Sequence, residues 1–155
     1  MAASKKEKRV KQKENPQGKY IGQRENPDNY YSKSPSWNFG TCDTELWAFS
    51  EDNAGPCFWD EILPHLKNWE SLHWSDILVV AKKNNHSVDV SLLNTSARKR
   101  LEEKFIEQEA LISLRLNGTH RIYGYMNGAV FNILWFDTTH GDNDYCVCRS
   151  RKKNT

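Results

Sequence analysis

The sequence predicts an α+β domain in which helices pack on an antiparallel sheet that ends as a three-stranded meander. Two Asn-Gly pairs, Asn117-Gly118 and Asn127-Gly128, separate three strand-like segments at 111–116, 119–126 and 129–137. Asn-Gly favours the type I′ turn, because both central residues of that turn need a positive φ. Apolar residues at helical spacing precede these segments. Together these observations predict helices first and two successive hairpins afterwards.

Two-residue turns also fix which residues lie opposite each other in a meander. The first turn is expected to pair Arg115 with His120, and the second to pair Tyr123 with Asn132. This register divides the polar residues of the strands between the two faces of the sheet. They are Arg115, His120 and Asp137 on one face, and Arg121, Tyr123 and Asn132 on the other. The other residues of both faces are mostly apolar, so we expect a covering layer on each face.

The helices are predicted from apolar stripes and from capping residues. Phe58, Ile62, Leu66 and Trp69 predict a helix over 57–70. Pro64 either kinks this helix or starts a second one, because proline lacks a backbone N–H. Ser75 is expected to cap a short helix over 76–82.

A further helix is capped by Asn94, Thr95 or Ser96, and its apolar side consists of Ala97, Leu101 and Phe105, which lie four residues apart. Two other segments have the character of short strands. Trp37 and Phe39 alternate with polar residues, and 86–90 forms either an extended linker or a strand.

The 155 residues suit one folded domain over 36–148, between a disordered basic tail at 1–35 and a second basic tail at 149–155. Residues 1–24 hold eight Lys or Arg and two Glu, whereas the whole chain has a net charge of only +2. A basic tail on an acidic body indicates contact with a polyanion, and the alternative is a solvated tail that aids solubility. The tail residues expected to bind RNA are Lys5, Lys6, Lys8, Arg9 and Lys11.

Composition also suggests the compartment. No apolar run reaches the roughly 20 residues that a membrane span needs. The first residues are charged and lack the apolar region of a secretory signal, so a cytoplasmic protein without a membrane partner is expected. Four cysteines, Cys42, Cys57, Cys146 and Cys148, are then expected to be free thiols, and a zinc site built from all four is the alternative.

Arg, His and Tyr side chains near the meander are candidates for phosphodiester chemistry. Arginine binds phosphate through two parallel hydrogen bonds, and histidine or tyrosine can move the proton of a ribose hydroxyl. The candidates are Arg115, His120, Arg121, Tyr123, His140 and Tyr145. The structural alternative is that the arginines pair with carboxylates, Tyr123 is a core ring and His140 caps a loop. Glycine-rich phosphate loops, G-x-S-x-G and H-E-x-x-H are absent from the sequence.

The segment from Leu114 to Tyr125, LRLNGTHRIYGY, follows two predicted helices and precedes an apolar strand that ends near His140. This arrangement resembles the RelE/ParE-like toxin superfamily, in which a helical pair packs on an antiparallel sheet. Residues 86–140 are more similar to an uncharacterised group of small bacterial and phage proteins with the pattern φSLRL-x-G-x-x-RφYG…φφLWφD-x-x-H. The resemblance implies a RelE-like fold and a catalytic set of Arg115, Arg121, His140 and Tyr145, with His120 and Tyr123 on bound RNA.

Two functions from different classes follow from these patterns. One is a RelE-like toxin of a toxin–antitoxin pair, an endoribonuclease that cleaves RNA, including ribosome-bound mRNA, without a metal or another cofactor. Its partners would be RNA, the ribosome and an antitoxin-like protein. The other is a non-catalytic protein of a phage or mobile element that binds a host protein or a nucleic acid.

Overall fold

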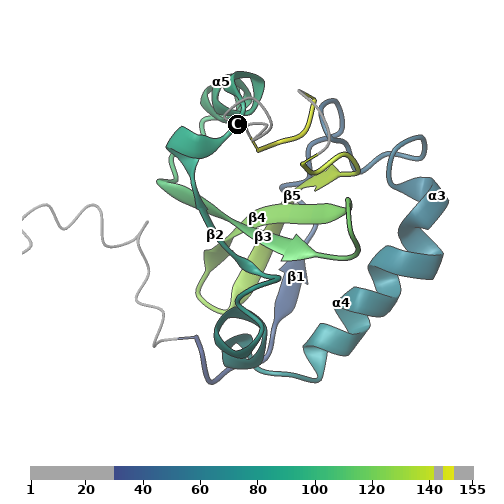
Figure 1. Cartoon of the computed structure of the whole chain (residues 1–155), viewed down its shortest axis with the longest axis vertical. Helices are drawn as coiled ribbons and strands as arrows, with labels where there is room; N and C mark the ends of the chain where they lie inside the picture. Colours follow the sequence, from purple (N-terminus) through teal and green to yellow (C-terminus); the bar gives the residue numbers. More distant parts are fainter. Residues whose placement is uncertain (1–29, 142–144, 149–155) are drawn as a thin grey trace, which may run out of the picture.

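The computed structural model describes residues 30–141 and 145–148, and its centre is a five-stranded sheet in the order β1-β5-β4-β3-β2 (Figure 1). The strands are β1 (Ser36–Asn38), β2 (His86–Asp89), β3 (Ala110–Arg115), β4 (Arg121–Asn127) and β5 (Val130–Asp137). Strand β1 runs parallel to β5, and the other neighbours are antiparallel. The predicted α+β class and the meander β3-β4-β5 are confirmed, although β1 makes the sheet mixed.

One continuous helical segment follows the loop after β1. It consists of α3 (Gly55–Cys57), the π-helical turn η2 (Phe58–Ile62) and α4 (Leu63–Glu70). The N–H of Leu63 donates to the carbonyl of Phe58, five residues earlier. This wider turn comes directly before Pro64, whose ring would clash with the carbonyl four residues back in a regular α-helix. A π turn therefore accommodates Pro64, and neither a second, separate helix nor an abrupt end is needed.

The next two helices differ in how well the sequence predicted them. Ser75 precedes a single π turn, η3 (Asp76–Val80), but its side chain makes no capping bond. The Asp76 carboxylate instead accepts a bond of 2.9 Å from the N–H of His73. Asn94 does cap α5 (Thr95–Glu103), since its side chain accepts from the N–H of Ser96. Ala97 and Leu101 are buried as expected, whereas Phe105 lies beyond the helix end and is 88% exposed. Between β2 and α5 lies one 3₁₀ turn, η4 (Val90–Leu92).

The turn between β3 and β4 is wider than the predicted two-residue turn. The Asn117 side-chain oxygen accepts bonds of 2.8 and 2.9 Å from the N–H groups of Thr119 and His120. The N–H of Leu116 donates to the carbonyl of His120 at 3.0 Å. The side chain of Asn117 thus closes the loop by bonding its own backbone, a competitor of the type I′ turn. As a result Arg115 lies opposite Arg121, and the predicted pairing of Arg115 with His120 is wrong.

The second turn is Gly128-Ala129, with a positive φ of 66° at Gly128, one residue further along than expected. Asn132 consequently lies opposite Tyr125, and the predicted pairing of Tyr123 with Asn132 is wrong. A bulge between Tyr123 and Gly124 then adds one residue to β5, so that Tyr123 lies opposite Trp135. These shifts place Arg115, Arg121 and Asp137 in one row across β3, β4 and β5, whereas His120 belongs with the other face.

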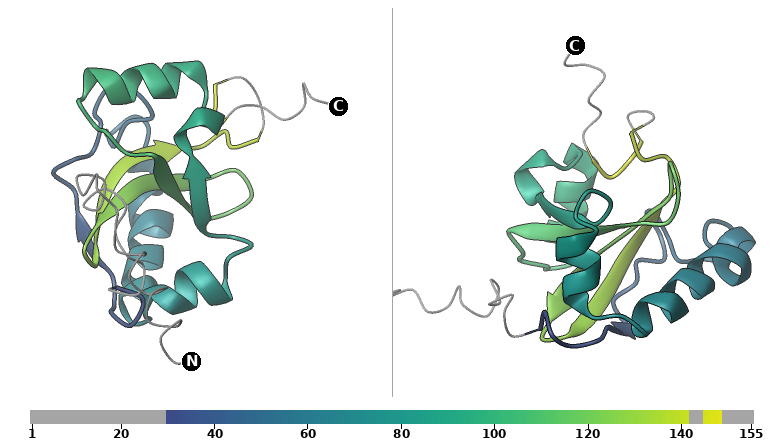
Figure 2. Two further views of the ribbon diagram at one scale, coloured as in Figure 1. Left: turned by 90° about the vertical axis from the view of Figure 1, so that its left-hand side faces the viewer. Right: turned by 60° about the horizontal axis from the view of Figure 1, so that its bottom comes forward.

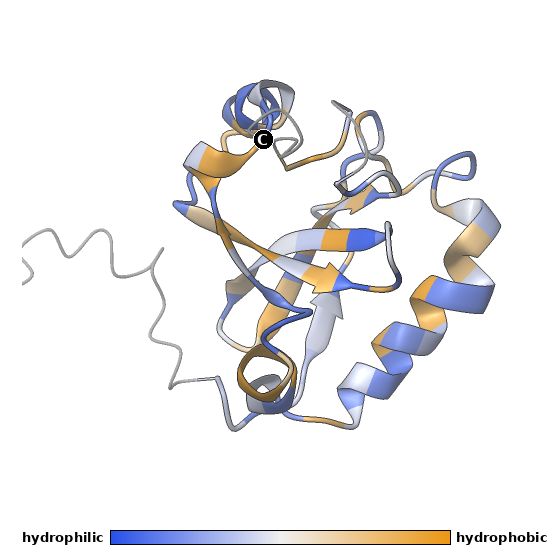
Figure 3. Cartoon of the chain, in the orientation of Figure 1, coloured by the Kyte–Doolittle hydropathy of each residue, from blue (hydrophilic) through white to orange (hydrophobic). Residues whose placement is uncertain are grey.

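Each face of the sheet carries its own core, as the apolar strands predicted. On one face, residues of η2, α4, η3 and the loop between them pack against β3, β4 and β5. The buried members of this core include Ile62, Leu66, Trp74, Ile77, Leu114, Ile122, Phe131, Ile133 and Phe136. On the other face Ala97 and Leu101 of α5 pack with Leu111, Tyr123, Leu134, Trp135 and Val147. Figure 2 shows these layers from two sides, and Figure 3 shows α5 largely hydrophilic beside the hydrophobic strands.

The carboxylate of Asp43 connects helix α5, strand β5 and the loop that follows β1, on the face of the sheet that α5 covers. It is fully buried and accepts bonds of 2.8 and 2.9 Å from the Arg100 guanidinium of α5. The Trp135 indole of β5 donates to it at 2.9 Å, and the N–H groups of Glu45 and Leu46 donate as well. Burial alone raises the pKa of Asp43, but these hydrogen bonds, led by that of Arg100, outweigh it and hold the pKa well below its usual value.

None of the helices in the described part of the chain is both long and apolar enough to cross a membrane.

The Gly124→Ala substitution is expected to destabilise the fold severely, because a Cβ there would lie 2.2 Å from the carbonyl oxygen of Asn132 and 2.7 Å from the Phe131 ring. We expect a loss of about 3 kcal/mol or more in the free energy of unfolding, measured by urea titration. Gly118→Ala is the matched control, since nothing lies within 4 Å of its Cβ position. Equal losses in both variants would contradict this account of the bulge.

The Asp43→Asn substitution is expected to cost about 3 kcal/mol near neutral pH, because it leaves Arg100 and Trp135 facing an uncharged amide. The pKa of Asp43 is lowered by folding, so its contribution is present above the unfolded pKa and is lost as the pH falls below it. The stability gap between wild type and variant should therefore narrow in acid. Glu103→Gln, which removes an exposed partner of Arg100, should cost about 1 kcal/mol or less at every pH.

Candidate functional site

The main cluster of polar side chains lies where β3 ends, β4 begins and β5 ends. Arg115, Arg121 and Asp137 face each other in register across these three strands. Tyr123 lies two residues further along β4 on the same face. The loop after β5 returns to this cluster, since the N–H of His140 donates to the carbonyl of Thr119 at 3.0 Å.

Arg121 is almost buried, with 9% of its surface exposed. Its Nη1 donates to the carbonyls of Asn117, Gly118 and His120 at 2.6, 3.3 and 3.1 Å. Burial lowers the pKa of Arg121, and the nearby positive charge of Arg115 lowers it further. The side chain therefore holds the β3–β4 loop, on the strand position that lies opposite Arg115.

Arg115 is the exposed member of this pair. Its Nη1 lies 3.5 Å from the side-chain oxygen of Asn84, which is a long hydrogen bond. Its backbone N–H is held more firmly, by a bond of 2.9 Å to the Asn85 side chain. The strand position of Arg115 is therefore fixed, while its guanidinium group faces solvent.

The Tyr123 hydroxyl connects the loop after β5 to the last described residues. It lies 3.4 Å from Nδ1 of His140 and 3.0 Å from Sγ of Cys148. Burial raises the pKa of Tyr123, and the proximity of Cys148 raises it further, so the phenol stays protonated at neutral pH. Burial likewise raises the pKa of the Cys148 thiol.

Asp137 fixes the loop that carries His140. Its carboxylate accepts from the N–H and hydroxyl of Thr139 at 2.8 and 3.0 Å, and from the N–H of Val147 at 2.8 Å. Burial raises the pKa of Asp137, although these hydrogen bonds partly offset the effect. The side chain thus anchors both the start of the loop and the segment 145–148 to the end of β5.

Of the predicted site residues, Arg115 lies opposite Arg121 across β3 and β4, and Tyr123, on the same face as Arg121, contacts His140. Tyr145 lies elsewhere: the residue is 76% exposed and lines a hollow of about 220 Å³ with Leu46, Trp47, Asn94 and Ser96. His120 was expected beside Arg115 and Asp137, but it lies on the other face, 2.6 Å from the Glu61 carboxylate. The predicted tail residues Lys5, Lys6, Lys8, Arg9 and Lys11 lie outside the described residues.

The sequence did not predict two residues as members of this site. Cys148 contacts Tyr123, and its alternation with Cys146 was the only signal in the sequence. Asn117 was read as a turn residue, whereas its side chain shapes the loop that Arg121 holds.

The alternative of a four-cysteine zinc site is wrong. Cys146 Sγ donates to the Cys148 carbonyl at 2.9 Å, and Cys148 faces Tyr123. Within residues 30–141 and 145–148, one group of three potential metal ligands converges, and it contains a single cysteine: Cys57, Glu61 and His120.

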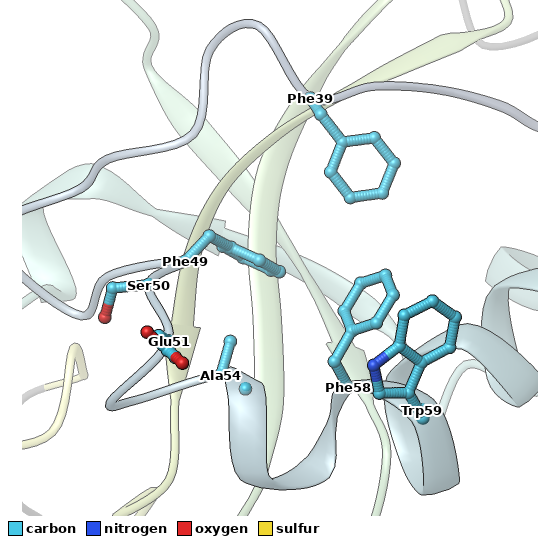
Figure 4. A pocket seen from close by; sticks show the side chains of 8 residues that line it. Phe39, Phe49, Ser50, Glu51, Ala54, Phe58 and Trp59 are labelled. Carbon is cyan, nitrogen blue, oxygen red and sulfur yellow. The ribbon is translucent and has the colours of Figure 1, made fainter.

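A separate apolar hollow of about 490 Å³ lies beside the start of the helical segment. Phe39, Phe49, Phe58 and Trp59 supply its rings (Figure 4), and Ser50, Glu51, Ala54 and Gly55 complete its lining. Trp59 and Phe39 are 73% and 44% exposed. This surface offers aromatic contact area but few polar groups.

Comparison with protein-family models gives no match. Comparisons with curated proteins and with solved structures give no match either.

The Tyr123→Phe substitution is expected to lower the free energy of unfolding by about 1 kcal/mol, because it leaves Cys148 and His140 without their shared hydroxyl partner. Tyr125→Phe, on the same strand but partly exposed, should change stability by less than about 0.5 kcal/mol. Urea titration of both variants measures the difference. Equal effects would show that the Tyr123 hydroxyl contributes nothing specific.

Proposed function

We propose that this chain is a RelE-like endoribonuclease that binds a phosphodiester at the end of the sheet and cleaves RNA. The observation that carries the proposal is the pairing of Arg115 with Arg121 across β3 and β4, beside Tyr123, whose hydroxyl contacts the imidazole of His140. Two neighbouring cations favour an anion that bridges them. Imidazole is the side chain most often used for proton transfer in catalysis.

In this proposal each side chain has a separate role. Arg115 faces solvent and makes the first contact with the phosphate, while Arg121 supplies a fixed positive charge behind it. His140 removes the proton of the ribose 2′-hydroxyl, whose oxygen attacks phosphorus as the bond to the 5′ oxygen breaks. The products are a 2′,3′-cyclic phosphate and a 5′-hydroxyl, after the leaving oxygen has taken a proton. Tyr123 positions the imidazole through its contact with Nδ1.

The charge distribution of the sequence agrees with an RNA substrate. Basic residues are concentrated in the first 24 residues and at Arg149, Arg151, Lys152 and Lys153, directly after Cys148. Such segments attract a polyanion with little sequence preference, and their contribution falls as salt rises. Ribosome-bound mRNA in the cytoplasm is the most specific form of this proposal, with an antitoxin-like protein as the inhibitor.

The His140→Ala and Arg115→Ala substitutions are expected to abolish RNA cleavage while leaving the fold intact. Loss of a proton-transfer group should slow cleavage about 10²- to 10⁴-fold. The measurement is growth after induced expression, with transcript 5′ ends mapped, followed by cleavage of ribosome-bound mRNA by the purified protein. Lys99→Ala, an exposed basic residue of α5, is the control for a change of charge alone.

Wild-type protein that leaves RNA intact both with and without ribosomes would contradict the proposal. So would cleavage that survives in the His140→Ala variant at the wild-type rate. Unfolding curves of each variant exclude a loss of activity through loss of structure.

The second candidate is a non-catalytic protein of a phage or mobile element that binds a partner protein. The apolar hollow with the exposed Trp59 favours it, because exposed aromatic side chains dominate the energy of many interfaces. In this case Trp59→Ala and deletion of residues 1–24 should abolish the growth effect, whereas Arg115→Ala and His140→Ala should not. The same growth assay therefore separates the two candidates.

A further inference from the structure

A second polar cluster lies on the other face of the sheet from Arg121, where the helical segment meets the β3–β4 loop. It contains the thiol of Cys57, the carboxylate of Glu61 and the imidazole of His120. One ligand atom from each residue lies within 4.8 Å of the other two, and all three residues are partly buried. The three groups come from positions up to 63 residues apart, so only the fold brings them together.

Two elements position these side chains. Cys57 is the last residue of α3, and Glu61 follows four residues later in η2, on the same side of the helical segment. His120 comes from the loop before β4, where its ring packs edge-to-face on Phe136 with a centroid distance of 5.4 Å. The imidazole is therefore held between an apolar ring and the carboxylate, with Nδ1 2.6 Å from Oε1 of Glu61.

The Glu61 carboxylate has a second hydrogen-bond partner. The side-chain amide of Asn117 donates to Oε2, while the side-chain oxygen of Asn117 holds the loop that carries His120. One asparagine thus orients both the carboxylate and the histidine. Metal sites use hydrogen bonds of this kind to fix the ligands that contact the ion.

We propose that Cys57, Glu61 and His120 bind a divalent zinc-class cation, with solvent in the fourth position. A thiolate, an imidazole and a carboxylate are the side chains that bind zinc, and the thiolate favours zinc over magnesium or calcium. A thiolate and a carboxylate carry two negative charges, which a divalent cation balances. Tetrahedral ligands around zinc lie about 3.3–3.7 Å apart, so shifts of about 1 Å in the side chains complete the site.

The cation would join the helical segment to the β3–β4 loop. The same loop is held from its other side by Arg121, through the carbonyls of Asn117, Gly118 and His120. The site is thus separate from the proposed phosphodiester site but shares a loop with it. Its existence does not depend on any activity of the protein.

Titration of the full-length, tag-free protein with cobalt(II) and zinc(II) tests this site. We expect one equivalent of metal, a thiolate-to-cobalt charge-transfer band in the near ultraviolet, and a higher melting temperature with zinc. Cys57→Ser should abolish the band and weaken zinc binding at least about 10-fold, and His120→Gln should weaken it similarly. Cys42→Ser is the matched control, because Cys42 is a partly buried free thiol outside the cluster.

The proposal is overturned if the wild-type protein binds less than one equivalent of zinc, or if the cobalt complex lacks the charge-transfer band. It is equally overturned if Cys57→Ser and His120→Gln bind zinc as tightly as the wild type. Circular dichroism of each variant shows that it is folded, and Glu61→Gln provides a third variant if either of the first two is not.

Discussion

The position of α5 on the sheet depends on the hydrogen bonds and the ion pair of one buried carboxylate, that of Asp43. It binds Arg100 of α5, the indole of Trp135 in β5 and two backbone N–H groups of its own loop. The same loop lies along β5 after β1 has ended. The N–H of Asp43 donates to the Leu134 carbonyl, and the N–H of Phe136 donates to the Trp47 carbonyl. Helix α5 is therefore fixed over the face that carries Tyr123, and Tyr123 is buried as a consequence.

Asp137 lies at the end of β5, and its comparison with Asp43 shows how the hydrogen-bond partners of a buried carboxylate decide its pKa. Asp43 has a guanidinium group in direct contact, and its pKa is lowered despite burial. Among the described residues, Asp137 accepts its hydrogen bonds from uncharged donors of Thr139 and Val147, and burial raises its pKa. The carboxylate of Asp43 connects α5 to the sheet through its ion pair with Arg100 and its bond from Trp135. That of Asp137, which is easier to protonate, organises the loop with His140, where the candidate chemistry is located.

The sequence was sufficient for features that depend on periodicity and on single capping residues. It predicted the class, the meander, the layers on both faces and a cap of α5 at Asn94, Thr95 or Ser96, of which Asn94 is the cap in the structure. It failed where a side chain competes with the backbone for hydrogen bonds. Asn117 and Asn127 precede glycines in the same way, but only Asn117 closes its loop with its side chain. The closure by Asn117 shifted the register of β3 and β4, so that Arg115 shares a face with Arg121, and the separate bulge between β4 and β5 placed Asp137 in the same row. The grouping of Arg115 with Arg121, and of His120 with Glu61, was therefore hidden from the sequence.

His120 and Arg121 are adjacent in the chain, yet they serve opposite faces of the sheet because side chains alternate along a strand. The loop before them is bonded by Arg121 from one side and, through Asn117 and His120, by Glu61 from the other. A cation bound at Glu61 would therefore restrain the same backbone carbonyls that hold the Arg121 guanidinium. Conversely, neither Arg115 nor His140 belongs to the cluster of Cys57, Glu61 and His120, and Cys57 does not belong to the proposed phosphodiester site. A cation bound by Cys57, Glu61 and His120 can thus stiffen the loop of the proposed phosphodiester site without supplying any of its chemical groups.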